Sequence, residues 1–222
     1  MKIDILTLFP EMFSGPFDES IIKRARDNNF VDINIHNLRN WTKDKHKQVD
    51  DKPYGGGAGM VLMVEPIDNA LSDLSTKNSK VILLSPKGKK FNQKLANRLS
   101  GEKHLIFICG HYEGFDERIS QKLTDLEISV GDFVLTGGEL PTMVVVDSIV
   151  RLIPGVLKKS DAIKFESFAD DLLEYPQYTR PDKYKGWKVP KVLLSGDHKK
   201  IEEWKKRESL KVTKKKRPDL LP

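Results

Sequence analysis

Two glycine-rich turns carry the side chains of this sequence that are best suited to chemistry. The first, residues 109–118, reads Cys-Gly-His-Tyr-Glu-Gly-Phe-Asp-Glu-Arg, and the second, residues 131–141, reads Gly-Asp-Phe-Val-Leu-Thr-Gly-Gly-Glu-Leu-Pro. Glycine lets the main chain approach a ligand closely. Tyr112, Glu113 and Arg118 add an aromatic ring, a carboxylate and a cation to the first turn. This mixture predicts a site for a polar ligand that has a planar part.

Covalent catalysis and metal chemistry are weaker possibilities. Cys109 lies near His111 in the sequence, but a thiol at the end of an apolar strand is usually inert core. A single cysteine excludes an internal disulfide framework and a zinc site built on cysteines. The five histidines show no metal-ligand spacing, so the sequence predicts no metal site.

A third glycine-rich segment covers residues 50–60, where two aspartates precede the run Gly55–Gly59. Neither the dinucleotide fingerprint nor the P-loop pattern fits this run. It is either a surface linker or an ordered site. The backbone entropy that so many glycines lose on ordering favours the site.

Parallel strands must hold these turns, because short apolar runs that end in glycine are typical of strands entering a loop. Open α/β sheets bind ligands at such strand ends. Strand and helix signals alternate over the first 157 residues, which predicts an α/β domain with a mostly parallel sheet. The expected strands are 2–9, 31–36, 80–84, 104–109 and 127–130, and the expected helices are 18–28, 66–74, 91–99, 115–123 and 139–152. Pro66 and Pro141 each suit a first helical position.

The character of the chain changes after Pro154-Gly155. The sequence pattern alone predicts three parts: an α/β domain over residues 1–157, a flexible linker over 158–167 and a basic, mainly helical domain over 168–222. Residues 175–181 contain two prolines and cannot form regular structure. A helix is expected from about Lys199 to Leu210, capped by residues 195–198.

The net charge of +6 is placed unevenly. Residues 1–157 hold 20 Lys and Arg against 21 Asp and Glu, whereas residues 158–222 hold 18 against 11. Such a concentration of positive charge favours a phosphate backbone as partner, although a solvated basic tail without a partner has the same composition. No apolar run is long enough for a membrane span and the first residues do not read as a secretion signal. We therefore expect a cytoplasmic protein.

Seven separated segments, in order, resemble the bacterial tRNA (guanine-N1)-methyltransferase family, whose members modify the guanine 3′ to the anticodon, guanine 37. The resemblance runs from Met1 to the Arg217-Pro218 ending. The segments are Pro53–Met60, Leu84–Pro86, Cys109–Arg118, Gly131–Pro141, Arg151–Gly155, Glu166–Phe168 and Tyr178–Pro181.

The resemblance implies a SPOUT fold, in which the C-terminal half of the parallel sheet is threaded into a deep trefoil knot. Knots are rare exceptions to the rule that chains do not thread loops. It also implies a homodimer whose active site lies between the subunits, and a cofactor, S-adenosylmethionine, held in the knot. The implied cofactor residues are Leu84, Ser85, Pro86, Gly110, Ser129, Val130, Gly131, Phe133, Leu135, Gly137 and Gly138.

By the same resemblance, Glu166 is the base that removes the proton of guanine N1, with Asp170 as rival. The family has aspartate where this chain has Glu166, so the carboxylate is kept on a longer arm. Arg151 would stabilise charge on guanine O6; spacing alone makes it a surface charge at a helix end. Gly59, Tyr112 and Glu113 would hold the guanine, although Glu113 could instead be a charge at the start of a helix near residue 115.

The basic C-terminal part is expected to bind the anticodon arm of tRNA, and residues 158–166 to become ordered when it does. The resemblance also implies that catalysis depends on magnesium, although the sequence shows no magnesium-binding motif. Two rivals stay open: a knotted methyltransferase that acts on an rRNA base or a tRNA ribose, and a non-catalytic basic RNA-binding module. The expected tRNA contacts are Tyr178, Arg180, His198, Lys214 and Lys215.

Overall fold

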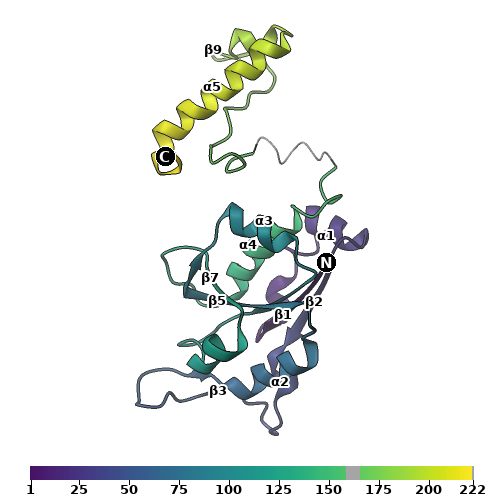
Figure 1. The fold of residues 1–222 in the computed structure, drawn as a ribbon, viewed down its shortest axis with the longest axis vertical. Coiled ribbons are helices and arrows are strands. Elements are labelled where there is room, and N and C mark those ends of the chain that lie inside the picture. The colour runs from purple at the N-terminus through teal and green to yellow at the C-terminus, as the bar shows by residue number, and fades with distance from the viewer. Residues whose placement is uncertain (159–165, 222) are drawn as a thin grey trace. The chain divides into compact units, whose positions relative to one another are not determined.

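The structure is a computed structural model that describes residues 1–158 and 166–221. It divides into two compact units, Met1–Lys158 and Lys159–Pro222 (Figure 1). The linker expected at 158–167 falls mostly outside the described residues. Among the residues that are described, no helix combines the length and apolarity needed to cross a membrane.

The first unit is built on a parallel five-stranded sheet of order β2-β1-β6-β5-β7. The parallel α/β arrangement expected from the alternating pattern is therefore confirmed. A separate antiparallel pair, β3 (Asp50–Asp51) and β4 (Val61–Leu62), brackets the third glycine-rich segment. The sheet strands are β1 (Lys2–Thr7), β2 (Asp32–Asn37), β5 (Ser79–Lys90), β6 (His104–Ile108) and β7 (Leu126–Ser129).

Helices cover both faces of the sheet, because successive residues of a strand point to opposite sides. Ile3 and Ile5 of β1 share one core with α1, α3 and α4, whereas Leu6 shares the other with α2 (Figure 1). The helices are α1 (Ser20–Asp27), α2 (Val64–Leu74), α3 (Gln93–Ser100) and α4 (Glu139–Val150), and the short turns are η1 (Pro10–Phe13), η2 (Leu38–Trp41) and the π turn η3 (Ile119–Leu123).

Three local expectations differ from the structure in detail. Strand β5 continues past residue 84, because Lys89 and Lys90 pair with β7 after a register shift. Pro66 and Pro141 occupy the third helical position, where the amide would have no intrahelical partner either. The helix expected at 115–123 is present but shorter, because residues 117–118 are α-helical and continue into the π turn η3.

The second unit is organised around α5 (His198–Lys216), which is longer than expected because lysines in its last turn suit the negative end of the helix dipole. The Asp197 side chain accepts from the Lys200 amide over 3.1 Å and caps the helix. Trp204 is buried and lies beside Tyr175 and Tyr178. The smaller elements are β8 (Lys183–Tyr184), β9 (Trp187–Lys188), η5 (Lys191–Leu194) and η6 (Pro218–Leu220).

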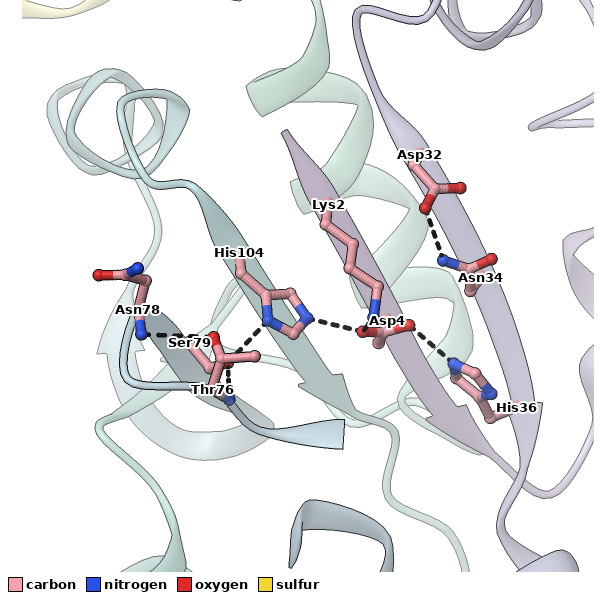
Figure 2. A network of polar contacts seen from close by, with 9 residues as sticks. All are labelled: Lys2, Asp4, Asp32, Asn34, His36, Thr76, Asn78, Ser79 and His104. Carbon is pink, nitrogen blue, oxygen red and sulfur yellow. Dashed lines mark hydrogen bonds and ion pairs between the residues drawn. The ribbon is translucent and has the colours of Figure 1, made fainter. Parts of the chain in front are cut away.

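A buried carboxylate joins the strands of the first unit at their amino-terminal half. Asp4 on β1 accepts from His36 of β2 over 2.8 Å, from His104 of β6 over 2.6 Å and from Lys2 over 2.8 Å (Figure 2). Ser79 at the start of β5 extends the network, with its hydroxyl 2.7 Å from Nδ1 of His104. Burial raises the pKa of Asp4, but the three donors outweigh it and hold the pKa well below its usual range.

We expect Asp4→Asn to lower the free energy of unfolding by about 3 kcal/mol at pH 7, because the three donors lose their charged acceptor. The pKa of the Asp4 carboxyl is lower in the folded protein than in the unfolded chain, where it is about 3.9. The ionised carboxylate therefore stabilises the folded state above that pH, and this stabilisation is lost as the pH falls towards the pKa of the folded state. Urea unfolding at pH 7 and pH 3 should therefore show a smaller difference between variant and wild type at pH 3. Asp32→Asn, which changes an exposed carboxylate bonded to Asn34, is the control, and an equal loss there would contradict the account.

Candidate functional site

A cavity of about 310 Å³ lies beside the middle of β5, at residues 83–87, and at the carboxyl ends of β6 and β7. Its walls are the segment that follows Leu84, both glycine-rich turns and the first turn of α4 at Pro141. The volume is at the lower end of the range for small-molecule sites. Loops after neighbouring parallel strands therefore converge on one pocket, as open α/β sheets favour.

All eleven residues expected to hold a cofactor line this cavity. They come from three stretches that are far apart in the sequence and that the sheet brings together. Their role as cofactor ligands stays a prediction. The residues are Leu84, Ser85, Pro86, Gly110, Ser129, Val130, Gly131, Phe133, Leu135, Gly137 and Gly138.

Main chain packs directly against main chain at two glycines of this region. A Cβ atom on Gly138 would lie 2.6 Å from the Gly110 nitrogen, and a Cβ on Gly88 would lie 2.4 Å from the Ile128 nitrogen. The Gly138 amide donates to the Gly110 carbonyl over 2.8 Å. Neither position has room for a side chain, so Gly138 lets the two glycine-rich turns meet and Gly88 lets β5 lie against β7.

Cys109 is a residue of the hydrophobic core and does not act as a nucleophile. Its thiol is buried and lies 3.1 Å from the Thr142 hydroxyl, and burial raises its pKa far above the usual value. A thiol that keeps its proton is a poor nucleophile. The structure therefore favours the inert reading of this cysteine.

A buried pair of polar side chains at the pocket wall was not anticipated. Glu139, at the start of α4, is fully buried, and its Oε1 accepts from the Thr7 hydroxyl over 2.6 Å. Its other oxygen lies 3.3 Å from Nε2 of His111, whose ring stacks 4.7 Å from that of Phe9. The pair ties the end of β1 to both glycine-rich turns. The run Gly-Gly-Glu-Leu-Pro, with an acidic residue in a first helical turn, was the only sequence signal for it.

The residues expected to hold guanine meet at the open side of the pocket. Tyr112 is 46% exposed and lines the cavity beside Glu113. A Cβ on Gly59 would lie 2.4 Å from Oε1 of Glu113, so the third glycine-rich segment also reaches this point. The alternative role for Glu113, at a helix start, is wrong: Asp116 lies there and accepts from the Arg118 amide over 2.9 Å. Arg118 holds the pKa of Asp116 below its usual range.

Arg151, one of the residues expected to do catalysis, does not line the cavity. Arg151 lies at the C-terminal end of α4, whereas the pocket lies at the N-terminal end. The helix has 12 residues, so about 18 Å separates its ends, which is more than an arginine side chain spans. Glu166 and Asp170 belong to a turn of the second unit, in which the Ala169 amide donates to the Glu166 carbonyl over 3.2 Å.

The side chains expected to contact tRNA are all exposed in the second unit. Tyr178 is 50% exposed and its ring centroid lies 6.4 Å from that of Trp204. Within residues 1–158 and 166–221, no three His, Cys, Asp or Glu side chains cluster as metal ligands would. The remaining exposed residues of this set are Arg180, His198, Lys214 and Lys215.

Known proteins resemble this chain over its whole length. Residues 1–222 match the family model described as tRNA (Guanine-1)-methyltransferase TrmD. A tRNA (guanine-N(1)-)-methyltransferase of Carboxydothermus hydrogenoformans is 58% identical over 221 residues, which cover 100% of this chain and 87% of that protein. Proteins of the same name from Bacillus pumilus and Clostridium beijerinckii are 57% and 59% identical, covering 100% and 99% of this chain and 92% of each relative. The chain therefore belongs to the tRNA (guanine-1)-methyltransferase family.

Proposed function

We propose that the protein methylates N1 of guanine 37 in tRNA, the base 3′ to the anticodon. The observation that carries the proposal is the family match over residues 1–222, together with relatives of that name at 54–59% identity. The pocket supports it, because a base and a methyl donor are both polar ligands with planar parts. The rival targets, an rRNA base or a tRNA ribose, have no observation in their favour.

The pocket suits S-adenosylmethionine. Main-chain N–H and C=O groups at Gly110, Gly137 and Gly138 can read an adenine edge, and the carboxylates of Glu113 and Glu117 at the wall suit a positively charged ligand. The bound cofactor supplies an electrophilic methyl group on a sulfonium. The chain's own contribution is to align the guanine with that group and to exclude water.

A trefoil knot is part of the proposal. The family match over residues 1–222 supports it. The close main-chain approaches at Gly88 and Gly138 belong to the tight packing around the pocket.

Proton removal is the step that needs a side chain. Guanine N1 is a poor nucleophile while it carries a proton, and a carboxylate within hydrogen-bond reach can accept it. We assign this role to Glu166, with Asp170 as the rival. The charge that then develops on O6 suits a guanidinium, which we assign to Arg151.

Arg151 and the pocket must come from different subunits, since the length of α4 separates them within one chain. An apolar surface supports a homodimer: Leu140 and Val144, one turn apart on α4, are 50% and 53% exposed, and Met12 of the adjacent η1 is 41% exposed. Exposed apolar surface of this kind marks protein contacts. We propose that this surface forms the subunit interface and that the site is completed across it.

The second unit would bind the anticodon arm through Tyr178, Arg180, His198, Lys214 and Lys215. Magnesium dependence and a cytoplasmic location complete the proposal. The linker expected at 158–167 and its ordering on tRNA binding fall mostly on residues that the structure does not describe.

Glu166→Gln is expected to lower the rate of methyl transfer about 100-fold or more, because the proton acceptor is lost. The measurement is tritium transfer from labelled S-adenosylmethionine into a tRNA transcript under single-turnover conditions. Asp170→Asn is the matched control and should stay within a few fold of wild type. Full activity of Glu166→Gln would exclude it as the base, and a transcript with adenine at position 37 should accept no methyl group.

A heterodimer of two inactive subunits is expected to regain activity in one of its two sites. Leu135→Arg places a cation in the pocket and should abolish binding of the sulfonium cofactor, while Glu166→Gln removes the base. Co-expression with two different tags, followed by tandem purification, gives the mixed dimer. It should reach about half of wild-type activity, whereas a site within one subunit would leave the mixture inactive.

A further inference from the structure

The β8–β9 hairpin of the second unit presents a small, regular surface. Lys183 pairs with Lys188 and Tyr184 pairs with Trp187 across the two strands. The turn between them is Lys185-Gly186, with φ of +49° and +87°. Left-handed conformations at both turn positions suit the twist of a tight hairpin. The turn therefore fixes which side chains face each other.

Two aromatic rings on this hairpin are left without cover. Trp187 is 72% exposed and Tyr184 is 53% exposed, and their ring centroids lie 5.9 Å apart. Trp204 of the same unit is only 7% exposed. Large aromatic side chains are mostly buried on average, and an exposed pair of them offers stacking surface to a ligand.

The hairpin carries three lysines whose charges oppose its folding. Lys183 and Lys188 stand directly opposite each other on the face away from the rings, because successive strand residues point to opposite faces, and like charges in that position are destabilising. Lys185 lies on the ring side, with Nζ 5.5 Å from the centre of the Tyr184 ring. Strands of two residues contribute little stability themselves. A polyanion would relieve the repulsion, so the charge pattern favours an anionic partner.

The hairpin is held in place by its neighbours. The Val189 amide donates to the Asp182 carbonyl over 2.9 Å and closes the base of the hairpin. Preceding it in the chain, Tyr178 lies beside the buried Trp204 of α5. The two rings are thus presented from an ordered base, which lowers the entropy lost on binding.

We propose that the β8–β9 hairpin is an RNA-binding platform, on which Trp187 and Tyr184 stack against an unpaired base while Lys185, at the turn beside the Tyr184 ring, contacts a phosphate next to it. Stacking on aromatic rings combined with a basic surface is how proteins bind unpaired nucleotides. A membrane surface would need a wider apolar area than two rings on a hairpin that carries three lysines. The inference rests on the proposed function only in taking tRNA as the source of the RNA.

Binding of an unmodified tRNA transcript by the full-length protein tests the platform. Trp187→Ala should raise the Kd roughly tenfold, because stacking of one base is lost, and Trp187→Phe should keep most of the affinity. Lys185→Gln should reduce the slope of log Kd against log salt by about one, and the control Lys77→Gln, at an exposed lysine of the first unit, should leave it unchanged. Cofactor affinity and thermal unfolding should match wild type in every variant.

Direct contact is tested by ¹⁹F NMR of protein that carries 5-fluorotryptophan, with the Trp187 signal assigned from Trp187→Phe. This signal should shift when tRNA is added and should not shift with S-adenosylmethionine alone. Wild-type tRNA affinity in Trp187→Ala would overturn the proposal. It would equally be overturned if that variant lost its dimer, or if its defect appeared only in binding to vesicles of anionic lipid.

The test separates this inference from the proposed reaction. If the wild-type protein binds the transcript but leaves N1 of guanine 37 unmethylated, the proposed function fails. The ratio of Kd values for Trp187→Ala and wild type still decides whether the hairpin binds RNA.

Discussion

The pocket depends on main chain lying against main chain. Gly88 packs on the Ile128 peptide and Gly138 packs on the Gly110 peptide, at distances where a single Cβ atom would collide with backbone. The first contact joins β5 to β7, and the second joins the segment after β6 to the start of α4. The cavity lies where these segments approach so closely, and peptide groups of glycines form part of its lining.

The other half of the sheet supplies a rigid base for these loops. Asp4 gathers donors from β1, β2 and β6 within the sheet, while Glu139 links the end of β1 to the loops themselves through Thr7. Both carboxylates are fully buried. Donors reach both oxygens of Asp4, whereas Glu139, among the described residues, accepts a hydrogen bond only at Oε1, from Thr7. Buried charge is tolerated where donors satisfy it, and the Asp4 network joins elements that are distant in the sequence. The hydrogen bonds of Asp4 and Glu139 thus fix how the strands and the pocket loops are positioned relative to one another.

The sequence predicted those features that depend on neighbouring residues in the chain. Short apolar runs predicted the strands, and the glycine turns predicted the pocket, since strand ends in a parallel sheet share one edge. The extension of β5 to Lys90 could not be predicted, because it depends on pairing with β7. The contact of His111 with Glu139 joins residues from two separate turns, and only the folded chain brings them together. Val145 and Val146 adopt a helix although valine prefers strands, because their burial on α4 outweighs propensity.

A wall made of peptide groups also has a pharmacological consequence. An inhibitor that hydrogen-bonds to the amides and carbonyls around Gly110, Gly137 and Gly138 would contact atoms that every amino acid shares. Point mutations change side chains and leave those atoms in place. Replacing the glycines themselves would push the two turns apart and close the pocket to the natural ligand as well. Resistance to such a compound would have to arise at the apolar rim, at residues such as Phe133 and Leu135, where side chains do form the surface.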